Sequence, residues 1–283
     1  MKTVVEICNF NDRKLVDALK GLALQTKQPD TVLVADGGSE VGYVREMTDY
    51  IHADPAISKL NIIWMELRGT PAETRQKSIQ YLDAEVTAFL DSDEVPYANW
   101  LEEITKPIME GRADFVGGPM KSVADKQDFI ASYYIEIENR IYNSDVAIEV
   151  TYMPLGNTAW KTEILKRLGF DARIAKSYGE AEDYDLEMRA IDNGYRGLYV
   201  PGALVRHYQN FPLTYWDLMR KRYQYLLGAA VVMVKNKRLG RRITEKRSRI
   251  RHPFGKVEAL MKPLALVHGY LKWHLVVSRR PSA

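Results

Sequence analysis

The stretch TAFLDSDEVPY, residues 87–97, joins a short apolar run to a cluster of acidic residues. Residues 87–90 have the length and composition of a buried strand. Asp91, Asp93 and Glu94 follow this run directly. Acidic residues after a strand often form only a solvated turn, but carboxylates two positions apart can also converge on a hard divalent cation, which prefers oxygen ligands. The stretch alone leaves both interpretations open, a turn or a metal site.

The length suits one large α/β domain or two smaller ones, and the composition is that of a folded, soluble protein. The chain has 283 residues, of which 46% are apolar and 27% are charged. It has one cysteine, Cys8, so no internal disulfide can form, and a reducing, cytoplasmic location is expected. The N-terminus becomes charged too early for a signal peptide, and no run of about 18 uninterrupted apolar residues predicts a membrane span.

Strand-like and helix-like segments alternate over the first 118 residues. The predicted strands are residues 3–8, 30–35, 61–67, 86–90 and 113–118, and the predicted helices are 15–26, 71–82 and 99–111. This alternation predicts a mostly parallel sheet flanked by helices, in which ligands bind beyond the carboxyl ends of the strands. Asn9, Asp36 and Asp91 all stand at such ends. We therefore expect three polar groups at one crevice, which favours the metal-site interpretation.

The second half of the chain is less regular. The predicted elements are a helix over 129–142, a strand, a loop at Gly156-Asn157 and a short helix within 149–170, a helix over 181–194, two extended segments within 195–208, and helices over 213–236 and 256–277. Residues 235–256, between the last two helices, contain ten Lys or Arg and one acid, Glu245. Such asymmetry suggests an anionic partner, either a membrane surface or nucleic acid.

Six motifs follow one another in an order that resembles the family 2 glycosyltransferases with the GT-A fold. They are ICNFN (7–11), VADGGS (34–39), AETRQKS (72–78), FLDSDE (89–94), LGNTAWKTEILKRLGF (155–170) and AEDYDLEMRAIDNGYRGLYVPGALVRH (181–207). Each motif is weak alone, but the ordered set makes the resemblance specific over about residues 1–225. Cys8 and Asn9 stand where proline and threonine are usual, and Gln76 replaces a usual asparagine. These departures bear on recognition of the nucleotide base of the donor rather than on the fold.

The resemblance implies an α/β fold of the GT-A (Rossmann-like) class, with a mixed, mostly parallel sheet flanked by helices and a C-terminal helical extension. It implies a catalytic domain over 1–214, with a nucleotide-sugar half (1–120) and an acceptor half (121–214). A basic, amphipathic helical extension then covers 215–283. The implied function is an inverting, metal-dependent transfer of a sugar from a nucleotide-sugar donor to a hydroxyl acceptor.

Glycosyl transfer requires that the leaving diphosphate is neutralised and that the acceptor hydroxyl loses a proton. A divalent cation meets the first need as a Lewis acid. The resemblance implies that Mn²⁺ or Mg²⁺ is held by Asp93, with Asp91 and His207 as further ligands. It implies that Asp183 is the general base. The alternatives are that His207 is an ordinary, partly buried histidine and that the acids around Asp183 form a solvated helix face.

The resemblance assigns the remaining pocket residues to the donor and the acceptor. The donor residues are Asn9, Asp36, Arg75, Asp91 and Ser92, and the acceptor or sugar residues are Gly156, Asn157, Glu182 and Asp185. Two of these residues also have a structural interpretation. Arg75 could pair with Asp91 or Asp93 in the empty protein, and Asp185 could pair with Arg189 four positions later on the same helix.

Two other classes of protein remain open. A sugar nucleotidyltransferase would carry a glycine-rich loop after the first strand, and CNFNDRK (8–14) has no glycine. A non-catalytic nucleotide-sugar-binding protein would not need Asp91, Asp93 and Asp183 together.

The C-terminal extension indicates where the protein works. Residues 215–235 and 257–277 are helix-like and apolar, with Trp273 and several lysines suited to a membrane interface. We expect a peripheral protein on the inner face of the cell membrane, with a polyprenyl-linked acceptor. Nucleic acid is the less favoured anionic partner. The alternatives are that these helices pack on the catalytic domain or form a homo-oligomer interface.

Overall fold

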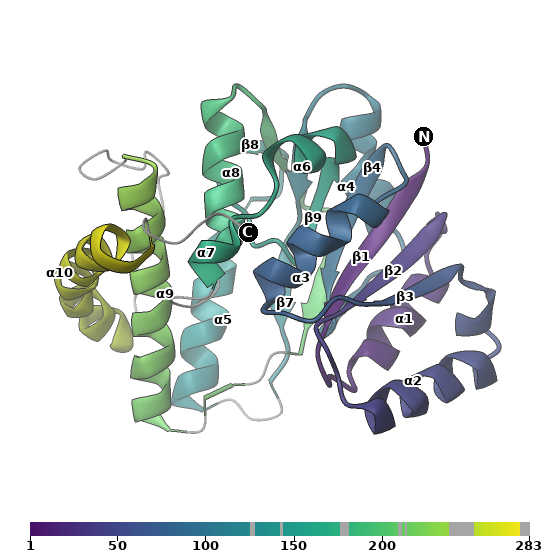
Figure 1. The fold of residues 1–283 in the computed structure, drawn as a ribbon, viewed down its shortest axis with the longest axis horizontal. Helices are drawn as coiled ribbons and strands as arrows, with labels where there is room; N and C mark the ends of the chain where they lie inside the picture. The colour runs from purple at the N-terminus through teal and green to yellow at the C-terminus, as the bar shows by residue number, and fades with distance from the viewer. Residues whose placement is uncertain are drawn as a thin grey trace.

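A computed structural model describes residues 1–124, 128–141, 144–175, 181–208, 211–212, 214–237 and 252–277 (Figure 1). Most of the basic run, residues 238–251, therefore lies outside the described residues.

The first half of the chain forms the parallel part of an eight-stranded sheet, in the order β3-β2-β1-β4. These strands are β1 Thr3–Asn9, β2 Thr31–Asp36, β3 Ile62–Glu66 and β4 Val86–Asp91. Asn9 pairs in register with Asp36, and Cys8 pairs with Asp91. The predicted strand ends therefore meet at one edge of the sheet, as expected.

The connecting helices match the predictions except at one place. They are α1 Leu15–Ala23, α2 Val41–Ala53, α3 Pro71–Ser78 and α4 Trp100–Met109. The helix α2 was not predicted. The start of α3 follows from its sequence: Pro71 occupies the first turn, and Thr70 and Glu73 cap each other's backbone amides.

The second half of the sheet has the order β9-β6-β10-β8. Its strands are β6 Phe115–Gly117, β8 Ile148–Val150, β9 Asn157–Lys161 and β10 Gly197–Tyr199. β9 runs antiparallel to both β4 and β6. The prediction of a loop at Gly156-Asn157 was therefore wrong at Asn157, which begins this strand.

Helices cover both faces of the sheet. Along β2, Val32 and Val34 pack with α1 and α4 on one face, whereas Leu33 belongs to the core on the other face. That second core includes Phe115 and Trp160, whose rings stack at 4.4 Å. It is covered by α3, α6 Thr162–Leu168 and α8 Glu182–Asp192.

A small second sheet lies beside the strand ends, in the order β5-β11-β7. Its strands are β5 Glu94–Pro96, β7 Met120–Ser122 and β11 Val205–His207. β5 and β7 are too short to have been predicted. In this sheet His207 stands opposite Glu94, which brings the last predicted motif to the DSDE stretch.

Three further helices gather on one side of the sheet (Figure 1). They are α5 Phe129–Ile141, α9 Tyr215–Lys235 and α10 Phe254–Lys272, which continues as a π-helical turn over Trp273–Val277. A Cβ on Gly269 of α10 would lie 2.6 Å from the Ala230 side chain, so α9 and α10 pack closely. Among the described residues, no helix combines the length and apolar character needed to cross a membrane. The domain boundary at residue 214 stays a prediction.

Candidate active site

Asn9 and Asp36 form a buried polar network where β1 and β2 end. The Asp36 carboxylate accepts hydrogen bonds from the Ser39 backbone amide (3.0 Å), the Ser39 hydroxyl and the Asn9 amide (3.3 Å). The Tyr43 hydroxyl donates to Asn9 Oδ1 (3.0 Å). Gly38 permits the turn, because its φ of 106° lies in the left-handed region. The network fixes the strand ends, and contact of Asn9 and Asp36 with a nucleotide stays a prediction.

Arg75 joins three elements through two ion pairs. Its guanidinium lies 2.6 Å from Asp91 Oδ1 on β4 and 2.7 Å from Glu182 Oε1 on α8. Burial by itself lowers the pKa of Arg75, but the carboxylates, Asp91 foremost, outweigh it and raise the pKa well above its usual value. The predicted structural pairing of Arg75 with Asp91 is confirmed. The donor role of Arg75 and the acceptor role of Glu182 stay predictions.

Glu94 is a fully buried carboxyl beside Asp91. Its Oε2 accepts from the Asp91 amide at 3.4 Å, and its buried Oε1 has no hydrogen-bond partner within the described residues. Burial, and next the charge of Asp91, raise the pKa of Glu94 well above its usual value. Gly156 permits this crowding, because a Cβ there would lie 2.5 Å from Asp91 Oδ2. Glu94 belonged to the acidic cluster in the sequence, but no role was predicted for it.

Asp93 and His207 are two residues of metal-ligating type whose side chains lie next to each other. His207 Nε2 lies 3.5 Å from Asp93 Oδ2, and both side chains are largely buried. Burial by itself raises the pKa of Asp93, but hydrogen bonding to His207 outweighs it and lowers the pKa. The Tyr208 amide donates to the Asp93 carbonyl at 2.8 Å, which holds the two chain segments together. Within the described residues, no group of three or more His, Cys, Asp or Glu side chains is arranged to hold a metal ion.

The loop after β1 secures this pair from a second side. Asp12 accepts a hydrogen bond from the Ser92 hydroxyl at 3.0 Å, and the Lys14 ammonium donates to the Tyr208 carbonyl. Ser92 therefore anchors the DSDE turn, and its contact with a donor stays a prediction. Asp12 and Lys14 were not predicted, although they stand in NDRK directly after the first motif.

Asp183 lies in the first turn of α8, at the same end of the sheet. Its Oδ1 accepts from the Tyr184 amide at 2.6 Å, and the Tyr152 hydroxyl donates to its Oδ2 at 3.4 Å. The neighbouring Glu182 pairs with Arg75 and so connects this turn to Asp91. Sequence reasoning missed Tyr152, since nothing in its surroundings marks it before the fold brings it to α8.

Two predicted acceptor residues, Asp185 and Asn157, are bound within the protein, and their contact with an acceptor stays a prediction. Asp185 is fully buried and bonds Arg189 (2.8 Å), Lys235 (2.7 Å) and Asn236 (3.0 Å). Residues two apart on a helix point about 200° apart, so Asp185 faces away from the side of Asp183. The predicted pairing of Asp185 with Arg189 is confirmed.

Asn157 is the other predicted acceptor residue with partners inside the protein. It is fully buried, its Oδ1 accepts from Trp100 Nε1 at 2.7 Å, and its Nδ2 donates to the carbonyls of Pro119 and Ala203, both at 2.9 Å. The amide therefore cross-links the core. The acceptor role of Gly156, next to it, stays a prediction.

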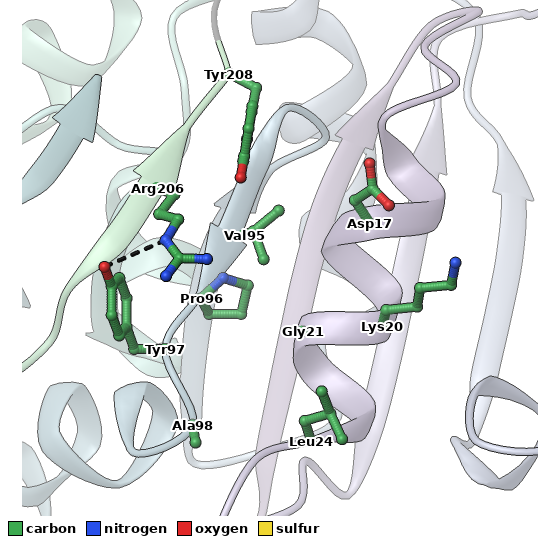
Figure 2. Close-up of a pocket in the computed structure, with 10 residues that line it drawn as sticks. All are labelled: Asp17, Lys20, Gly21, Leu24, Val95, Pro96, Tyr97, Ala98, Arg206 and Tyr208. Carbon is green, nitrogen blue, oxygen red and sulfur yellow. Dashed lines mark hydrogen bonds between the residues drawn. The ribbon is translucent and has the colours of Figure 1, made fainter. Parts of the chain in front are cut away.

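A groove of about 470 Å³ lies on the other face of the β5–β11 ribbon, between this ribbon and α1 (Figure 2). Arg206 Nε donates to the Tyr97 hydroxyl at 3.2 Å on one wall, and Lys20 stands on the other. Side chains alternate along strands, so Arg206 points away from the face that carries His207. No predicted site residue lines this groove.

The fold and the strand-end acids define a GT-A architecture, and comparison with known proteins gives the family. A model of glycosyl transferase family group 2 matches residues 86–279, so the chain belongs to this family. Pre-mycofactocin glycosyltransferases from two strains of Mycobacterium tuberculosis (CDC 1551 and H37Rv) are each 27% identical over 230 residues, or 79% of this chain. The chain spans 45% of the length of these relatives.

Solved glycosyltransferase structures share the fold. S. aureus TarS matches with a TM-score of 0.57 at 16% identity, over 96% of this chain and 55% of that one. The mannosyltransferase PcManGT from Pyrobaculum calidifontis, in complex with GDP-Man and Mn²⁺, matches with a TM-score of 0.57 at 18% identity, over 99% and 76%. GalNAc-T7 with UDP, GalNAc and Mn²⁺ matches with a TM-score of 0.61 at 13% identity, over 98% and 56%. The predicted GT-A fold is confirmed.

A buried acid behind the site makes stability depend on pH. Glu6 on β1 lies under α3, where its carboxyl accepts from the Ser78 hydroxyl at 3.2 Å. Burial raises its pKa to about 7, although Arg75 and Ser78 lower it. A raised pKa means that the folded state keeps a proton which the unfolded state releases. The contribution of Glu6 to stability is therefore full below about pH 4.5 and is lost as pH rises through about 7.

We expect Glu6→Gln to stabilise the protein more at pH 8 than at pH 5, by about 2 kcal/mol, because the amide carries no charge to bury. Urea unfolding of the variant and the wild type at both pH values measures this difference. Glu163→Gln, on an exposed position of α6, is the control and should show no such change. An equal effect of Glu6→Gln at the two pH values would contradict the prediction.

Proposed function

We propose that the chain is an inverting, metal-dependent glycosyltransferase that moves a sugar from a nucleotide-sugar donor to an acceptor hydroxyl. The observation that carries this proposal is the chain of contacts Asp91–Arg75–Glu182, which ties the candidate base Asp183 to the strand-end acids. A base at this crevice can take the proton of the acceptor hydroxyl. The strand-end acids can hold the cation that neutralises the leaving diphosphate.

The donor side rests on Asp93 and His207. A carboxylate and an imidazole suit Mn²⁺. Because no third ligand is arranged around this pair within the described residues, a cation would also need the phosphate oxygens of the donor. Bound there, Mn²⁺ or Mg²⁺ would neutralise the leaving diphosphate as a Lewis acid. The complexes of similar structures with GDP-Man and Mn²⁺, and of TarS with UDP-GlcNAc, support this choice of donor and metal.

The acceptor side rests on Asp183. Its carboxylate takes the proton of the acceptor hydroxyl as the new C1–O bond forms and the bond from C1 to the diphosphate oxygen breaks. One displacement at C1 inverts its configuration. Tyr152 and the Tyr184 amide hold the carboxylate in place for this step.

Incubation with UDP- and GDP-sugars in the presence of Mn²⁺ and a mixture of acceptors tests the function. We expect release of nucleoside diphosphate that depends on both donor and acceptor. Release of pyrophosphate from a nucleoside triphosphate and a sugar phosphate would instead favour a nucleotidyltransferase. Binding of a sugar nucleotide, seen as a thermal shift, with no turnover for any pair would favour a binding protein.

We also propose that the protein works as a peripheral enzyme at the inner face of the cell membrane, on a polyprenyl-linked acceptor. The helix α10 exposes Leu260, Leu264, Val267 and Leu271 with spacings of four, three and four, so they share one face. Leu264 and Val267 are 67% and 63% exposed. An apolar face of this kind, with lysines nearby, suits insertion at the surface of a bilayer.

We expect the chain to float with vesicles of anionic lipid, more weakly at high salt, and Leu264→Glu/Val267→Glu to reduce the bound fraction about tenfold or more. The control is Leu24→Glu, an exposed leucine directly after α1, which should bind as the wild type does. Equal recovery without and with lipid would contradict the proposal. If the double variant turned a dimer into a monomer and left vesicle binding unchanged, the face would be an oligomer interface instead.

A further inference from the structure

The end of α9 is clamped to the helix that carries Asp183. The Lys235 ammonium lies 2.7 Å from both carboxylate oxygens of Asp185 on α8 and 2.8 Å from Asp171 Oδ2. Asp171 directly precedes α7 Ala172–Ala175, which in turn comes before α8. Asn236 adds a bond of 3.0 Å to Asp185. One lysine therefore joins the end of α9 to two points, Asp185 on α8 and Asp171 just before α7.

Charge neutralisation does not account for this lysine. Asp171 has its own ion pair with Arg173 at 2.6 Å, and Asp185 has its own with Arg189 at 2.8 Å. Each buried carboxylate would therefore remain paired without Lys235, and the cost of an unpaired buried charge would not arise. Among these contacts, Lys235 provides the ionic connection between the end of α9 and α8, beside the hydrogen bond from Asn236.

Apolar packing places α9 against the same part of α8. Val232, one turn before Lys235, is fully buried with Ala181 and Met188, and Tyr184 packs at the edge of this cluster. Tyr184 is also the residue whose amide bonds Asp183, and its ring meets that of Tyr152 at 5.3 Å. The α9 contacts therefore reach the residues that surround the Asp183 carboxylate.

The helix α10 reaches this cluster as well. The ring of Trp273, directly after α10, lies 5.6 Å from the guanidinium of Arg173, the partner of Asp171. Both helices of the extension thus converge on α7 and α8, and Figure 1 shows α9 running beside them. Four of the donor residues, Asn9, Asp36, Asp91 and Ser92, stand on β1, β2 and the DSDE turn, and the fifth, Arg75, stands on α3 and reaches α8 through Glu182. Lys235 contacts none of them in any described interaction.

We propose that Lys235 is a positioning residue for the transfer step, which it serves by holding α8 so that Asp183 meets the acceptor hydroxyl. This inference rests on the proposed function, in which Asp183 is the general base. Proton transfer requires the base within hydrogen-bond reach, and a displacement of about 1 Å can cost about a hundredfold in rate. The C-terminal extension is accordingly part of the catalytic machinery and not only an anchor.

The test is Lys235→Met in the full chain, with a soluble acceptor and no lipid. We expect the variant to fold, to bind the donor within about twofold of the wild type, and to lose about 10- to 100-fold in kcat. Lys235→Arg keeps a cation at the clamp and should recover most of the rate. Lys166→Met, which removes an exposed lysine from α6, is the matched control and should be unchanged.

A double-mutant cycle separates positioning from general loss of stability. In the Asp183→Asn background, Lys235→Met should lower kcat no further, because the group that it positions is already inactive. Should Lys235→Met fail to fold, Lys235→Gln, which can still bond one carboxylate, takes its place in the cycle with the same expectation.

Three results would overturn the inference: an unchanged kcat in a folded variant, a loss of donor affinity as large as the loss of rate, or full additivity with Asp183→Asn. If the wild type transferred no sugar, the proposed function would fail first. If the wild type transferred sugar and Lys235→Met equalled it, only the inference about Lys235 would fail.

Discussion

Replacement of Asp93 by alanine is expected to remove sugar transfer, with a loss of about a thousandfold or more, while the protein stays folded. The side chain is one half of the Asp93–His207 pair, in which a carboxylate of the DSDE turn meets the imidazole of β11. A metal that stabilises the leaving group contributes several kcal/mol to the transition state, and about 4 kcal/mol corresponds to a thousandfold in rate. Its loss leaves the diphosphate without its counter-charge.

The fold should tolerate this change. The Asp93 side chain pairs with His207 at 3.5 Å, and the backbone bond from Tyr208 to the Asp93 carbonyl does not depend on that side chain. Circular dichroism and thermal unfolding check the fold, and titration with Mn²⁺ checks metal affinity. Asp49→Ala, on an exposed position of α2, is the control. A chelator in excess should stop the wild type, and added Mn²⁺ or Mg²⁺ should restore it. Full transfer in the presence of the chelator would disprove the metal requirement.

The strand-end part of the site could be predicted because it depends on local sequence. Apolar runs identified β1, β2 and β4, and in a parallel sheet the carboxyl ends of such strands share one edge. Asn9, Asp36 and Asp91 follow from that rule alone. α2 was missed because it buries only Tyr43 and Met47, so its sequence has little apolar periodicity.

The acceptor side depended on long-range packing and was predicted less well. Asn157 and Asp185 are polar residues within motifs that resemble those of the family, and sequence reasoning assigned both to acceptor or sugar binding. Their actual partners, such as Trp100 for Asn157 and Lys235 for Asp185, lie about 50 or more positions away in the chain. A buried polar group requires partners, but a sequence does not name them until the fold brings them together. The same limit hid Tyr152 and Glu94.

Replacement of Asp183 by asparagine is expected to lower kcat by about 10²- to 10⁴-fold and to leave donor affinity within about twofold. Asparagine keeps the shape of the side chain: its Oδ1 can still accept from the Tyr184 amide, and its Nδ2 can donate to the oxygen of the Tyr152 hydroxyl, in place of the bond that Oδ2 accepts in the wild type. It cannot take the proton of the acceptor. Because the carboxylate acts on the acceptor and not on the donor, rate and donor binding should separate.

Steady-state transfer and donor titration measure these two quantities on the same preparation. Asp49→Asn controls for loss of a carboxylate elsewhere on the surface. The pH dependence gives a further check: the rise in kcat with pH that reports ionisation of the base in the wild type should be absent in the variant. If donor affinity fell as far as the rate did, Asp183 would be a binding residue. The base would then have to be sought among the other carboxylates of the crevice, beginning with Glu182, which stands next to it on α8 and faces Arg75.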